Sequence, residues 1–312
     1  MSNSTDMSLA SLCKTPLLAF EVLVCVCGFF GSGVSLWCVK TCDKMQAGTK
    51  IQLCLLFGVN LFVCSLALPG TLAVEVLFLQ GRRVERATEV AFRALYAISC
   101  CVEELALTVV AVYRLIAVCF PSRYNLWSRP TVVLAVETIL VLLTVVLLVL
   151  PFFVTDSQGI NLSRSVGGEV FNIIFYVLPT AINLVSYCTV IILMASRRWA
   201  SGSGEARPGR WDQVSLSLSV LILMNLLLDV PHFTMHFLHV DWKEPRLLIA
   251  HALYRLLFAL QPIVFVGLNA RYRQKALKAV LALVPGRRVP PPPAEVTSGS
   301  PRITTALPLS DL

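Results

Sequence analysis

Charged residues are scarce in this sequence. They make up 14% of its 312 residues, whereas 56% are hydrophobic and the mean hydropathy is +0.76. An average soluble domain carries roughly 25% charged residues, so this chain has too few to cover a soluble surface. Apolar runs of about 20 residues recur along it, as membrane spans require. The runs are continuous rather than alternating, which favours spanning helices over a closed barrel.

Several chemical motifs are also missing. The chain has no CxxC pair with zinc spacing, no HExxH, no GxSxG and no clustered metal ligands. These absences disfavour a membrane enzyme, and we expect no metal and no cofactor. Most of the eleven cysteines lie inside apolar runs, where cysteine usually packs as a small hydrophobic residue. No internal repeat and no paired broken helices are present, which argues against a seven-span transporter or channel, although that alternative stays open.

The apolar runs predict an all-α membrane protein, namely a seven-transmembrane helix bundle with a short amphipathic eighth helix. The expected spans are Pro16 to Val39, Ile51 to Val76, Ala87 to Cys119, Thr131 to Val154, Glu169 to Ala195, Asp212 to Leu238 and Leu247 to Leu268. We expect residues 1–15 to be an extracellular amino terminus and residues 16–269 to be the membrane domain. Residues 270–285 would form the basic eighth helix on the membrane surface, and residues 286–312 a disordered cytoplasmic tail.

Basic residues indicate the orientation. With the amino terminus outside, the inner loops, helix edges and tail hold 17 of the 26 lysines and arginines, as the positive-inside rule requires. Two glycosylation sequons, at Asn3 and Asn161, then also fall outside. The net charge of +8 is explained by this bias, so it does not indicate a nucleic-acid partner.

Several residues stand at spacings that the spans of one receptor family share. They are Asn60 and Pro69 in span two, Tyr113, Arg114 and Pro121 at the end of span three, Pro179 and Tyr187 in span five, Pro231 in span six, and Gln261, Pro262 and Phe265 in span seven. Across about Cys25 to Leu281 the chain thus resembles the rhodopsin-like (class A) G-protein-coupled receptors. It looks like a divergent, orphan or chemosensory-like receptor. Both cysteines of the family's outer disulfide are missing, and Glu89 stands near the first position.

The resemblance implies that Tyr113, Arg114, Tyr187 and Phe265 couple the bundle to a heterotrimeric G protein. In the family an acidic residue precedes the arginine and pairs with it in the inactive state, whereas this chain has Tyr113. We therefore expect raised basal signalling, with Asp212 as the only nearby substitute acid. The alternatives are that Arg114 merely extends to the membrane interface, or that the protein no longer couples.

The family also keeps a sodium-binding cluster among spans two, three and seven. Here the corresponding residues are Asn60, Glu103 and Gln261, with Glu104 beside them. The family's acidic residue on span two is thus replaced by Asn60, and a carboxylate is found on span three instead. The sequence leaves open whether this is an internal ion site or a neutral glutamate that is hydrogen-bonded within the bundle.

Positive and titratable residues fall in the outer halves of spans three, six and seven. They are Arg93, Tyr96, Asp229, His232, His236, His251 and Arg255. We expect them to form the ligand pocket, which would suit an anionic or polar ligand. Because intramembrane charges usually pair, Asp229 and Arg255 are expected to form an ion pair or a polar ligand contact.

The tail suggests further partners. Its serines and threonines could be phosphorylated and attract an arrestin-type protein, and the ending at Leu312 fits a PDZ ligand that binds by strand addition. The sequence as a whole predicts a non-enzymatic plasma-membrane receptor that couples an extracellular ligand to a G protein.

Overall fold

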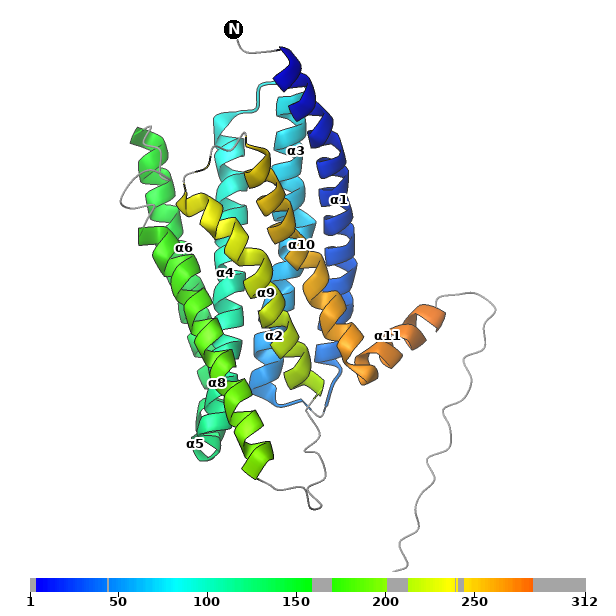
Figure 1. The fold of residues 1–312 in the computed structure, drawn as a ribbon, viewed down its shortest axis with the longest axis vertical. Helices are drawn as coiled ribbons and strands as arrows, with labels where there is room; N and C mark the ends of the chain where they lie inside the picture. The colour runs from blue at the N-terminus through cyan, green and yellow to red at the C-terminus, as the bar shows by residue number, and fades with distance from the viewer. Residues whose placement is uncertain are drawn as a thin grey trace, which may run out of the picture. The chain divides into compact units, whose positions relative to one another are not determined.

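A computed structural model describes residues 4–43, 45–158, 170–200, 213–238, 240 and 244–282. These residues form helices and no strand. The helices are α1 (Ser4–Lys40), α2 (Ala47–Phe62), α3 (Leu68–Leu79), α4 (Arg86–Cys119), α5 (Pro121–Trp127), α6 (Pro130–Gln158), α8 (Leu178–Ala200), α9 (Gln213–Phe237), α10 (Pro245–Leu268) and α11 (Ala270–Ala282), with π-helical turns η1 (Val63–Ala67) and η3 (Ile173–Val177) (Figure 1).

Seven helical segments are long and apolar enough to cross a membrane, so the predicted number of spans is confirmed. They are Pro16–Lys40, Ala47–Phe78, Arg86–Cys119, Pro130–Leu148, Val170–Leu193, Leu216–Phe237 and Arg246–Leu268. The second span combines α2, η1 and α3. Many large apolar side chains of α6 and α8 face outward, such as Val146 (60% exposed) and Ile192 (65% exposed). Lipid chains would cover such a surface in a bilayer.

Two helices occupy central positions in the bundle. Helix α10 packs against both α1 and α9, and Figure 1 shows it running between them. Helix α4 packs against α2, α6 and α8. Close approach of α1 to α10 depends on Gly28, because a side chain there would lie 2.9 Å from the carbonyl oxygen of Phe258. We call the end of the bundle where α1 begins, α3 ends, α4 begins and α9 ends the amino-terminal side.

Prolines explain the two π-helical turns. A proline within a helix removes one backbone donor, and its ring clashes with the carbonyl four residues earlier. Pro69 follows η1 by two residues, and Pro179 follows η3 by two residues. In both spans the wider turn accommodates the ring without breaking the helix.

The segment after span three differs from the expectation. The expected spans leave residues 120–130 as a connection between spans three and four, but Pro121–Trp127 forms helix α5 there. Proline at the first helical position explains the difference, because its missing N–H would be unpaired there in any case and its fixed φ suits a helix.

The predicted eighth helix is present as α11. Its start is capped by Asn269, whose side-chain oxygen accepts hydrogen bonds from the backbone N–H groups of Arg271 (3.2 Å) and Tyr272 (3.3 Å). Tyr272 is buried, and its ring lies 5.3 Å from that of Phe265 on α10. By its contacts the chain divides into residues 1–276 and 277–312, and of the second unit the described part is the end of α11.

Candidate functional site

A cavity of about 790 Å³ lies on the amino-terminal side of the bundle. Residues of α1, α3, α4 and α10 line it, among them Glu21, Thr71, Glu75, Phe78, Glu89, Phe92, Arg93, Tyr96, His251 and Arg255. Small-molecule sites typically measure about 300–1,000 Å³ and combine apolar walls with a few polar groups. Both the volume and the mixed lining of this cavity fit that description.

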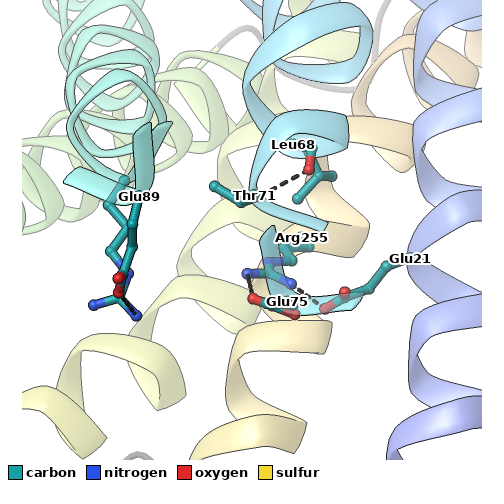
Figure 2. A network of polar contacts seen from close by, with 7 residues as sticks. Glu21, Leu68, Thr71, Glu75, Glu89 and Arg255 are labelled. Carbon is teal, nitrogen blue, oxygen red and sulfur yellow. Dashed lines mark hydrogen bonds and ion pairs between the residues drawn. The ribbon is translucent and has the colours of Figure 1, made fainter. Parts of the chain in front are cut away.

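A buried arginine joins three helices at this cavity. Arg255 on α10 forms an ion pair with Glu21 on α1 and a longer one, at 3.5 Å, with Glu75 on α3. Figure 2 shows its guanidinium group between the two carboxylates. The same group lies 5.5 Å from the centre of the Tyr96 ring on α4, within range of a cation–π interaction.

The two carboxylates of this ion-pair triad differ in exposure. The side chains of Arg255 and Glu21 are 9% and 3% exposed, so both are largely shielded from water. The side chain of Glu75 is 50% exposed and faces the cavity. Glu21 is therefore the buried partner of the arginine, whereas Glu75 is the acid that an incoming ligand can reach.

A second ion pair lies on the cavity wall. Arg93 and Glu89, one turn apart on α4, are 2.7 Å from each other. Three carboxylates and two guanidinium groups thus line the cavity, which gives it a formal charge of −1 when His251 is neutral.

A polar network lies among α2, α4 and α10. The Asn60 amide donates to the side-chain oxygen of Gln261 (2.7 Å), and the Gln261 amide donates to a carboxylate oxygen of Glu103. All three side chains are fully buried. The sequence predicted this grouping. It did not predict which residues would bond to Glu104, the acid next to Glu103 on α4.

That neighbouring acid is bound by two other helices. Asn183 on α8 and Asn225 on α9 each donate to one carboxylate oxygen of Glu104, at 3.1 and 2.6 Å. Glu104 thus links α4 to both helices. A buried polar group needs such partners in a low-dielectric interior.

The predicted coupling residues lie at the other end of the bundle. Tyr113 packs against Val109 on its own helix and Val133 on α6. Tyr187 on α8 belongs to the main hydrophobic core. The ring of Phe265 on α10 lies 4.8 Å from that of Phe57 on α2 and also packs on α11.

Sequence comparison identifies the class of protein. Residues 25–279 match the family described as serpentine type 7TM GPCR chemoreceptor Srsx. The chain belongs to this chemoreceptor family. Membership confirms the resemblance to rhodopsin-like receptors and implies a non-enzymatic receptor that senses its ligand through G-protein coupling. No individually curated protein matches the chain significantly.

The cavity of this Srsx-family receptor contains part of the expected pocket. Arg93, Tyr96, His251 and Arg255 line it. Asp229, His232 and His236 do not; they lie on α9 beside the contact with α10. The expected ion pair between Asp229 and Arg255 is not formed, because Arg255 pairs with the two glutamates of the triad.

The sequence did not lead us to two acidic residues near Arg255 or to a cluster of three histidines. Glu21 and Glu75 lie within apolar runs, and the cost of intramembrane charge could have marked both as notable acids, although not as the partners of Arg255. We also expected no clustered metal ligands, yet ligand nitrogens of His232, His236 and His251 lie within 4.8 Å of one another. The histidines come from two helices, so their proximity depends on helix packing.

Other predictions lie outside the described residues. They concern the sequons at Asn3 and Asn161, the substitute acid Asp212, and the arrestin and PDZ segments of the tail.

Arg255→Met should lower the free energy of unfolding by about 3–5 kcal/mol, because it leaves Glu21 buried without its partner. The matched control is Arg246→Gln near the start of the same helix. Arg246 is 79% exposed and pairs with Glu244 at 3.7 Å, so its loss should cost about 1 kcal/mol or less. Denaturant unfolding in lipid nanodiscs measures both changes. Equal losses of unfolding free energy in the two variants would show that the buried ion pair of Arg255 contributes no more to stability than the exposed pair of Arg246.

Proposed function

We propose that this protein is a plasma-membrane chemoreceptor that binds a small polar ligand in the cavity among α1, α3, α4 and α10 and activates a heterotrimeric G protein at the opposite end of the bundle. The observation that carries the proposal is the cavity itself, which has a buried ion-pair triad within a chain of the Srsx family. The receptor family makes a seven-span transporter the weaker explanation.

The proposed orientation places the amino-terminal side outside the cell. The distribution of lysine and arginine supports it, since most of them fall on the other side. The cavity would then open toward extracellular ligands. Arg114 near the end of α4 and the basic start of α11 would face the cytoplasm, where a G protein docks.

The charges of the cavity narrow the class of ligand. The basic residues alone suggested an anionic or polar molecule, but Arg255 is already paired with two carboxylates and Arg93 with one. An anionic ligand would have to displace those acids. We therefore favour a polar ligand with a basic group that pairs with the half-exposed Glu75 in place of Arg255.

Raised basal activity is part of the proposal. Tyr113 takes the position at which the family resemblance places an acid, and its ring is buried between α4 and α6. A phenol held in that contact cannot supply the carboxylate that restrains the motif arginine in related receptors. The resting state would then be less strongly favoured over the active one.

Coupling is tested first with Arg114→Ala. Recruitment of a panel of G proteins is measured in cells, with and without a panel of small amines, amino acids and carboxylic acids, at matched surface expression. Wild type should recruit at least one G protein and Arg114→Ala should not. The control is Arg82→Ala, an exposed arginine at the opposite end, which should behave as wild type. Absence of recruitment by well-expressed wild type would instead identify a receptor-like protein that does not couple.

The ligand class is tested with Glu75→Gln. Compounds that carry a basic group should activate wild type, and their potency should fall at least tenfold in the variant, because one charge-assisted contact is lost. Glu85→Gln, an exposed acid before α4, is the control and should leave potency unchanged. Activation by carboxylic acids alone, unaffected by Glu75→Gln, would contradict the proposed chemistry.

Basal activity is tested at Tyr113. Tyr113→Asp should reduce ligand-free recruitment, because it restores an acid next to Arg114. Tyr113→Phe keeps the packing and adds no charge, so it should match wild type. If both variants signal without ligand as wild type does, the phenol has no part in setting the resting state.

A further inference from the structure

Three histidines meet where α9 packs against α10, next to the cavity. His232 and His236 lie one turn apart on α9, and His251 lies on α10. Their ring nitrogens lie within 4.8 Å of one another. The ring centres are 4.7 Å apart for the two residues of α9, and lie 4.6 and 5.1 Å from the ring of His251. The three rings thus lie close together where the two helices meet.

From this geometry we propose that His232, His236 and His251 form a binding site for a divalent transition-metal ion of the Zn²⁺ class. Zinc–imidazole bonds of about 2.0–2.1 Å in a tetrahedral site place neighbouring nitrogens about 3.3 Å apart. The Nε2 atoms of His232 and His236 lie 3.2 Å apart, at hydrogen-bonding distance, and an ion that replaced this hydrogen bond would find the two nitrogens at the spacing that it requires. A modest rotation of His251 would complete a three-histidine set, with water as the fourth ligand.

A buried acid next to the cluster gives independent support. Asp229 is 1% exposed, and neither of its carboxyl oxygens has a hydrogen-bond partner. One of them lies 3.7 Å from Nδ1 of His232, which also has no hydrogen bond. In metal sites a carboxylate commonly accepts the Nδ1–H of a ligating histidine and leaves Nε2 free for the ion. Asp229 stands where it can serve as that positioning residue, and a nearby cation would offset the cost of burying it.

Two further contacts suit such a site. The ring of Tyr254 stacks on His232 with ring centres 4.3 Å apart and planes 11° apart, which fixes the orientation of the imidazole. His251 also lines the cavity, so an ion can reach the cluster by the route that a ligand would take. Imidazole nitrogen favours zinc, copper, nickel and cobalt, whereas calcium and magnesium prefer oxygen ligands.

The ion would connect α9 to α10. An ion bound to both helices stabilises the arrangement in which they are in contact, so its occupancy should oppose any G-protein recruitment that requires the two helices to move relative to each other. This consequence rests on the proposed function, whereas binding of the metal does not. The test therefore measures binding on the purified protein.

The experiment uses the full-length chain without a polyhistidine tag, stripped of metal, in lipid nanodiscs. Titration with Zn²⁺ in a calorimeter should show one equivalent bound, and the apparent unfolding temperature should rise with Zn²⁺ but not with Mg²⁺. Co²⁺ in the same sample should give the intense visible absorption of a tetrahedral site. Weak absorption typical of octahedral Co²⁺, or no saturable binding, would overturn the proposal in favour of three histidines that only pack together.

Single substitutions locate the site. His236→Gln and His251→Gln should each weaken Zn²⁺ binding at least tenfold, and Asp229→Asn should weaken it about 10–100-fold while Co²⁺ keeps tetrahedral absorption at saturation. Thr234→Val is the matched control, because its hydroxyl bonds only within α9, to the carbonyl of Val230. The fourth histidine, His239, is replaced in a comparison variant, which should bind Zn²⁺ as wild type does. Loss of binding in His239→Gln with full binding in His251→Gln would place the ion elsewhere and refute the site.

Discussion

The cost of burying charge between membrane helices determines much of this structure. Arg255 lies in an apolar bundle with little access to water, and a charge there is tolerated only with partners. Glu21 and Glu75 supply them from two other spans. The same constraint explains why Glu104 accepts hydrogen bonds from two asparagines and why Glu103 is bonded to Gln261. Each of these groups therefore links helices that are distant in sequence.

Three positions along α10 contact different parts of the bundle. Arg255 borders the cavity, Gln261 belongs to the polar network one to two turns farther on, and Phe265 packs on α2 and α11. A ligand that pairs with Glu75 would weaken the ion pair between Glu75 and Arg255. Because all three lie on one helix, a shift of α10 would reach the end where Arg114 stands. The proposed metal site would act on the same helix from its contact with α9.

The sequence was sufficient for the fold and for part of the site. Asn60, Glu103 and Gln261 could be grouped because motif spacing fixes their depth in the membrane. Glu21 and Glu75 could not, because an apolar run shows that a helix spans but not which face turns inward. The partner of Arg255 depends on that rotation, so Asp229 was chosen incorrectly. Likewise, the i, i+4 spacing of His232 and His236 is visible in the sequence, whereas the approach of His251 depends on how α10 packs.

The ion pair between Glu21 and Arg255 is the interaction that stabilises the bundle at its cavity. A double-mutant cycle tests it most directly, with unfolding free energies measured in nanodiscs for wild type, Glu21→Gln, Arg255→Met and the double variant. Each single variant leaves a buried polar group without its partner, so the double variant should be more stable than the sum of the single losses implies. We predict a coupling energy of about 1–3 kcal/mol. Additive losses, with a coupling energy near zero, would contradict it.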